Sequence, residues 1–164
     1  MKSRDYNQSK PHSLARLLDA EAGGGAEWSA ADMAAILRHQ LNAPLRADLG
    51  ATNPNAGKTL DTVSAAGLPP ATFGELFAHS HPPLELLELA KDFGKALRLD
   101  SSCGVPAEVA TVIYYASIVA ARVRLGRRIS DLDEAALRRG VEWTLAQPWL
   151  DAAMRAMFEQ VWRS

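Results

Sequence analysis

The sequence predicts an all-α fold, a compact bundle of about six to seven helices around a central apolar helix at residues 106–125. Apolar residues recur at intervals of three and four through most of the chain, as on one face of a helix. No segment alternates apolar and polar residues with the β-branched enrichment typical of a half-buried strand. Prolines and glycines fall where helices would begin and end. Together these patterns favour helices packed on helices.

The first third of the chain is expected to contribute a tail and a helical pair. Residues 1–12 are polar and are expected to be a mobile tail, and residues 13–50 are expected to form an N-terminal helical pair. The first helix covers 13–22 and stops at three consecutive glycines. Ser29 is the expected N-cap of the second, because its hydroxyl can accept a hydrogen bond from a free backbone N–H.

Residues 51–70 lose this periodicity. Pro, Gly, Asn, Ser and Thr dominate there, so the segment is predicted to be a linker or a long loop. It contains Gly57-Lys58-Thr59, but a phosphate-binding loop also needs a glycine five places before Gly57, where Thr52 stands. We therefore interpret this triplet as chance.

Residues 71–164 are expected to form the main helical bundle. Thr72 and Glu75 have the spacing of a capping box at the start of a short helix. Pro82 and Pro83 are expected to open a long helix over residues 82–98, because proline is tolerated in a first helical turn.

The central helix carries the strongest signal. Residues 106–125 begin with proline, are followed by Gly126, and are apolar on nearly every side. A helix of this kind in a water-soluble protein is contacted by neighbours on several faces. Residues 130–133 then offer a cap for a further helix, and Pro148 is expected to open the last one.

The bulk composition favours a soluble, cytoplasmic protein. The formal net charge is −1, which gives no global argument for nucleic acid or an anionic membrane as partner. A single cysteine excludes an internal disulfide and suits a reducing compartment. The N-terminus lacks the apolar core of a signal peptide, and the longest charge-free apolar stretch, 109–121, is too short to span a bilayer. The 13 arginines against 5 lysines are typical of a GC-rich, for example bacterial, genome.

His79-Ser80-His81 is the segment that most resembles a chemical site. Structural zinc needs four ligands and catalytic zinc three, and no third ligand lies near this pair in the sequence. We therefore expect Ser80 or His81 to cap the following helix, with no metal and no cofactor bound. The alternative is a small helical enzyme, metal-dependent or using His79, His81 and Cys103, since a thiol before a helix N-terminus is activated.

The arginines form the most defensible surface feature. Six fall within eighteen residues and exceed the nearby carboxylates by three: Arg122, Arg124, Arg127, Arg128, Arg138 and Arg139. Cations at the C-terminal end of a helix have a purely structural explanation, because they complement the helix dipole. The functional interpretation is an anion-recognising patch. We expect a non-catalytic interaction or regulatory (adaptor) module that binds an acidic protein surface, with nucleic acid as the alternative partner.

Overall fold

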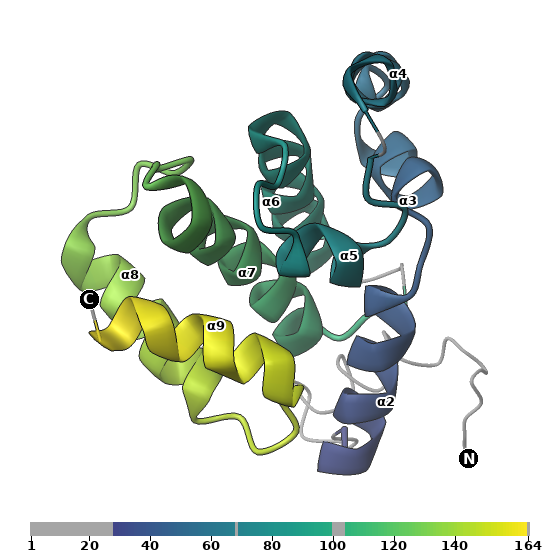
Figure 1. Cartoon of the computed structure of the whole chain (residues 1–164). Coiled ribbons are helices and arrows are strands. Elements are labelled where there is room, and N and C mark those ends of the chain that lie inside the picture. The colour runs from purple at the N-terminus through teal and green to yellow at the C-terminus, as the bar shows by residue number, and fades with distance from the viewer. Residues whose placement is uncertain (1–27, 68, 100–103, 164) are drawn as a thin grey trace.

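A computed structural model describes residues 28–67, 69–99 and 104–163, and over these residues the protein is all-α, as predicted. Eight helices and no β-strand occur in the described ranges (Figure 1). The helices are α2 (Ala30–Leu41), α3 (Leu45–Thr52), α4 (Ala56–Ala66), α5 (Phe73–Ala78), α6 (Leu84–Leu99), α7 (Ala107–Leu125), α8 (Glu134–Leu145) and α9 (Ala152–Arg163). The expected tail (1–12), the expected helix over 13–22, and Cys103 lie outside the described residues.

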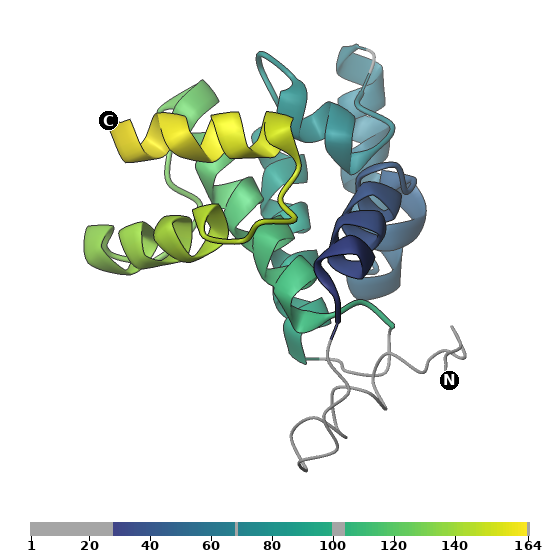
Figure 2. The same cartoon turned by 90° about the horizontal axis from the view of Figure 1, so that it is seen from below.

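Helix α7 is the centre of the bundle, as its apolar sequence predicts. It contacts α2, α5, α6, α8 and α9. Figures 1 and 2 show α8 and α9 on one side of it and α2, α3 and α4 on the other. Ten of its residues are buried, including the polar Ser117, whose hydroxyl donates to the carbonyl of Ile113 at 2.9 Å. The helix therefore satisfies its one buried hydroxyl internally.

The seam between α6 and α7 is unusually close because α6 carries Gly94 there. A Cβ at this position would stand 2.8 Å from the backbone nitrogen of Tyr114 and 3.0 Å from the carbonyl oxygen of Ala110. Both atoms belong to the backbone of α7, so no side-chain rotation could make room. Glycine therefore sets the distance between the two helices that share the largest contact of the fold.

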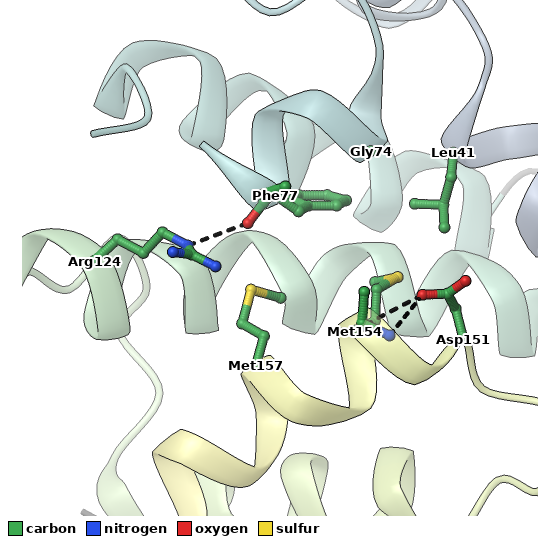
Figure 3. A pocket seen from close by; sticks show the side chains of 9 residues that line it. Leu41, Gly74, Phe77, Arg124, Asp151, Met154 and Met157 are labelled. Carbon is green, nitrogen blue, oxygen red and sulfur yellow. Dashed lines mark hydrogen bonds between the residues drawn. The ribbon is translucent and has the colours of Figure 1, made fainter. Parts of the chain in front are cut away.

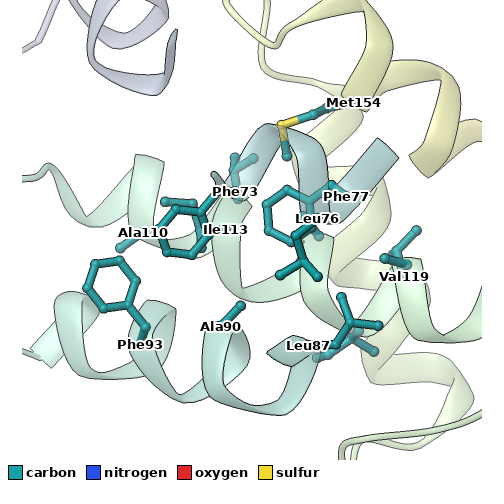
Figure 4. Packing of buried hydrophobic residues seen from close by; sticks show 14 of the residues in the cluster. Phe73, Leu76, Phe77, Leu87, Ala90, Phe93, Ala110, Ile113, Val119 and Met154 are labelled. Carbon is teal, nitrogen blue, oxygen red and sulfur yellow. The ribbon is translucent and has the colours of Figure 1, made fainter. Parts of the chain in front are cut away.

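Three phenylalanines fill the space beside this seam (Figure 4). Phe73 on α5 stacks on Phe93 of α6 with ring centroids 5.3 Å apart, and lies 6.1 Å from the ring of Phe77. All three rings are buried. A short helix such as α5 has little stability of its own, so this apolar contact is what holds it on the bundle.

Three predicted helix starts are confirmed. The side chain of Ser29 accepts from the N–H of Asp32 at 3.0 Å, and that of Thr72 accepts from the N–H of Glu75 at 3.2 Å. Within the expected segment 130–133, Asp133 is the cap of α8. The end of α7 is also as predicted, with Gly126 in the left-handed region at φ +65°.

Two other predicted starts are wrong. Helix α6 begins at Leu84, and the carbonyl of Pro83 accepts its first backbone hydrogen bonds, so neither Ser80 nor His81 is its cap. Helix α9 begins at Ala152 rather than at Pro148. The reason is Asp151, whose carboxylate accepts hydrogen bonds from two backbone N–H groups of the first turn and so caps the helix three residues after Pro148.

The segment 51–70, predicted as a linker or long loop, differs most from expectation. It contains the helix α4, of which Ala56 and Leu60 are buried against the core. An ion pair of 2.8 Å between Arg46 and Asp61 adds a contact between α3 and α4. Ala56 and Leu60 are four residues apart and lie among Gly, Thr and Ser, which are weak helix formers. Burial of these two residues against neighbouring helices therefore stabilises α4, although the local helix propensity is low.

Candidate functional site

The structure gives the two adjacent histidines a local structural role. Nδ1 of His79 accepts a hydrogen bond from the backbone N–H of His81 at 3.0 Å, which closes the turn between α5 and α6. Within the described residues, no group of three or more His, Cys, Asp or Glu side chains is placed to hold a metal ion. The position of Cys103 relative to this turn falls outside the described residues.

The six predicted arginines do not all point to one surface. Arg122 and Arg124 stand two positions apart on α7, about 200° around the helix, and so face opposite ways. Arg122 forms an ion pair with Glu134 at the start of α8. Arg138 lies over the ring of Trp162 on α9, with its guanidinium carbon 5.4 Å from the ring centroid. Nε of Arg124 donates to the carbonyl of Phe77, so three of the six cations are engaged within the fold.

Arg127 and Arg128 lie in the exposed turn that follows α7. Their side chains make no hydrogen bond or ion pair with any residue of the described ranges. The turn itself is fixed, because the ammonium group of Lys91 on α6 donates to the carbonyl of Ile129 at 3.0 Å. Two cations are therefore presented to solvent from a backbone that the core holds in place.

An apolar pocket of about 110 Å³ opens between α5 and α9, beside the C-terminal end of α2 (Figure 3). Its wall is formed by Leu41, Gly74, Phe77, Ala78, Arg124, Asp151, Ala153, Met154 and Met157. The two methionines come from α9 and face Phe77 of α5 across the pocket. Methionine is flexible and polarisable, so a wall of this kind adapts to apolar groups of different shape.

Two charged groups mark the two ends of this pocket, and Figure 3 shows them on opposite sides. Nε of Arg124 donates to the carbonyl of Phe77 at 3.2 Å, which fixes the guanidinium at one end. Its two terminal nitrogens have no partner among the described residues. At the other end, Oδ1 of Asp151 accepts from the backbone N–H groups of Ala153 at 2.9 Å and Met154 at 3.3 Å.

A second, wider groove of about 430 Å³ lies over α6, α7 and α8. It is lined by Arg98, Thr111, Tyr115, Ala136, Arg139, Gly140 and Trp143. Arg139, the remaining predicted arginine, thus faces a surface that Arg124 does not share. A Cβ on Gly140 would stand 2.2 Å from the ring of Tyr115, so the glycine lets this ring lie directly against the backbone of α8.

One carboxyl group of the described residues has a shifted pKa. Partial burial raises the pKa of Asp48 above its ordinary value, while a hydrogen bond from the amide of Gln40 and the nearby His39 act in the opposite direction. This group lies on α3, and neither the pocket nor the groove includes it. It bears on stability rather than on a site.

The residues that sequence reasoning missed are Phe77, Met154 and Met157 in the pocket, and Arg98, Tyr115 and Trp143 in the groove. Five of these six are apolar or aromatic residues on helices whose apolar positions repeat at three and four, and nothing in that repeat marks which of them lines an opening. The sixth, Arg98, lies outside the cluster of six arginines over residues 122–139, so the local excess of positive charge did not mark it.

Comparisons with known proteins give no function for this chain, so a functional proposal has to come from the geometry of its surface. No family model, no curated protein and no solved structure matches the chain. Among the described residues, no helix combines the length and the apolar character that crossing a membrane requires.

Proposed function

We propose that this chain is a non-catalytic helical interaction module that binds an acidic segment of a partner protein. An apolar side chain of the partner enters the pocket between α5 and α9, and a neighbouring carboxylate pairs with Arg124. The observation that carries the proposal is the position of Arg124, which closes one end of an apolar pocket and keeps two guanidinium nitrogens without a partner among the described residues.

The size of the pocket suits one side chain rather than a large ligand. An apolar cavity of about 150 Å³ holds a molecule of the size of benzene. The pocket, at about 110 Å³, therefore fits an aliphatic group of the size of leucine. Burying such a group contributes about 1.5–3 kcal/mol, which is typical of an anchor residue at an interface.

Arg124 adds orientation to this anchor. Because its Nε is held by the carbonyl of Phe77, the terminal nitrogens form a fixed pair of donors at the mouth. A guanidinium fork matches a carboxylate with two parallel hydrogen bonds. At the opposite end, Asp151 repels a second carboxylate, so the acidic residue of the partner has to follow the Arg124 side of its apolar anchor.

The exposed turn after α7 adds two cations on the Arg122 side of the helix, because Arg127 and Arg128 line a small hollow together with Arg122 and do not line the pocket at Arg124. Arg127 and Arg128 follow Arg124 by three and four residues, and Lys91 fixes the backbone between them and α8. Cations away from the contact itself steer the encounter with an acidic partner through their long-range field and contribute less to affinity. The single cysteine of the chain favours the cytoplasm, and its arginine-rich composition a bacterial cell, as the place of this encounter.

The test is a selection of random dodecapeptides displayed on phage against the immobilised full chain. Enriched peptides are expected to share an apolar residue next to Asp or Glu. A selected peptide should lose at least about tenfold in affinity on Arg124→Met, because a charged hydrogen bond is worth about 1.5–3 kcal/mol. Lys95→Met is the matched control, since it removes an exposed cation from α6, which does not line the pocket.

Three results would overturn the proposal. The first is a selection that enriches no acidic peptides. The second is a selected peptide that binds Arg124→Met and Lys95→Met with equal affinity. The third is tight binding of nonspecific DNA or RNA that falls steeply with salt and competes with the peptide. Circular dichroism of each variant establishes that it is folded. Arg124→Lys keeps the charge but loses the planar guanidinium fork, so this variant should retain part of the affinity for the peptide.

A further inference from the structure

The groove over α6, α7 and α8 combines two arginines with two aromatic rings, and the proposed interaction at the α5–α9 pocket makes no use of it. Arg98 comes from the last turn of α6, and Arg139 comes from α8. Tyr115 and Trp143 line the same groove. From this arrangement we infer a binding site for a planar aromatic ligand that carries a phosphate group, such as a nucleoside monophosphate.

The aromatic part of the site is preorganised. Gly140 has no side chain, so the ring of Tyr115 lies against α8, where a Cβ would come within 2.2 Å of it. The ring also makes an edge contact with Tyr114 at a centroid distance of 5.1 Å. One turn along α8 from Arg139, Trp143 is 36% exposed. A base stacks on rings of this kind largely independently of its identity.

The cationic part of the groove suits a phosphate dianion. The guanidinium carbon of Arg98 stands 5.4 Å from the centroid of the Tyr114 ring, which holds the side chain in place, and the residue is exposed. Neither Arg98 nor Arg139 forms an ion pair within the described residues. A phosphate monoester carries a charge of about −1.5 to −2 and three acceptor oxygens, which two guanidinium groups complement.

The volume and the neighbouring charges agree with this ligand class. Small-molecule sites occupy about 300–1,000 Å³, and the groove measures about 430 Å³. Among the described residues, no acidic side chain lines it. Glu142 is adjacent to Trp143 on α8, but it is exposed and is not part of the groove wall. The groove thus combines one arginine from α6 and one from α8 with aromatic rings from α7 and α8.

The experiment is a titration of the full chain, labelled with ¹⁵N at the tryptophan indoles, with AMP, with adenosine and with inorganic phosphate. The four tryptophans of the chain give four indole signals. AMP is expected to shift the signal of Trp143. Adenosine and phosphate alone should each bind at least about tenfold more weakly, because each retains only half of the contacts. Arg139→Met should weaken AMP by a similar factor.

Matched variants separate this site from nonspecific binding. Trp143→Leu should abolish saturable AMP binding, whereas Trp162→Leu, which removes the other exposed tryptophan of the described residues, should leave it unchanged. The inference is wrong if millimolar AMP does not shift Trp143, if adenosine or phosphate binds as well as AMP, or if Arg139→Met has no effect. Peptide binding at the α5–α9 pocket is expected to persist in Trp143→Leu. A failure of the nucleotide site can therefore be distinguished from a failure of the proposed peptide site.

Discussion

Gly94→Ala tests the close approach of α6 and α7. The added Cβ would meet the backbone nitrogen of Tyr114 at 2.8 Å, its Cα at 2.9 Å and the carbonyl oxygen of Ala110 at 3.0 Å. Ordinary van der Waals contact begins near 3.4 Å, so the two helices would have to separate by several tenths of an ångström. Overpacking of this kind costs about 1–3 kcal/mol. We take the upper end, about 3 kcal/mol, because backbone cannot rotate away.

Alanine also favours the helix over glycine by about 1 kcal/mol, so the net loss in the free energy of unfolding should be about 2 kcal/mol. Urea denaturation followed by circular dichroism at 222 nm measures it. Gly50→Ala is the matched control, because a Cβ there meets nothing within 4 Å and the substitution should stabilise α3 by up to about 1 kcal/mol. If Gly94→Ala stabilises the protein as Gly50→Ala does, the described seam is not the one in solution.

Three further predictions follow from the same contacts. Asp48→Asn should raise the free energy of unfolding at neutral pH, because the pKa of Asp48 is raised in the folded protein and its ionised form opposes folding. This advantage should be lost as the pH falls toward 3.8. Urea titrations of both proteins at several pH values measure it, and an advantage that grows in acid would contradict the reasoning. Asp133→Ala should cost about 1 kcal/mol through loss of the α8 cap, with Asp131→Ala, a neighbour without that contact, as the control. Gly140→Ala should displace the ring of Tyr115 and change the near-ultraviolet circular dichroism, and an unchanged spectrum would show that the ring does not lie there.

The central helix could be predicted because its sequence has only one stable environment. A run such as Val109–Ala121 without a charge has no polar face to turn to water, so neighbours must cover it on several sides. The cap at Thr72 and the helix end at Gly126 could also be predicted, because each satisfies free backbone groups through contacts within a few residues of the chain. Helix α4 was not readable, because Leu60 and Ala56 become a helix face only when α3 and α6 bury them.

The candidate site could be predicted only in part, because closeness in sequence does not imply a common surface. Arg122 and Arg124 diverge around α7, and Arg138 and Arg139 are separated by 100° on α8. The sequence therefore predicts an excess of positive charge around the end of α7 but not which cations remain available. That depends on long-range partners such as Glu134 for Arg122.

The most direct test of the central claim, that an acidic partner segment docks in the pocket between α5 and α9, uses the methionine methyl groups. The chain has four methionines, and Met154 and Met157 both line the pocket, whereas Met33 is buried in α2 and does not. With ¹³C-methyl labelling, a saturating acidic peptide should shift the signals of Met154 and Met157 and leave that of Met33 in place. Binding that leaves both pocket signals unmoved would place the partner elsewhere and contradict the account.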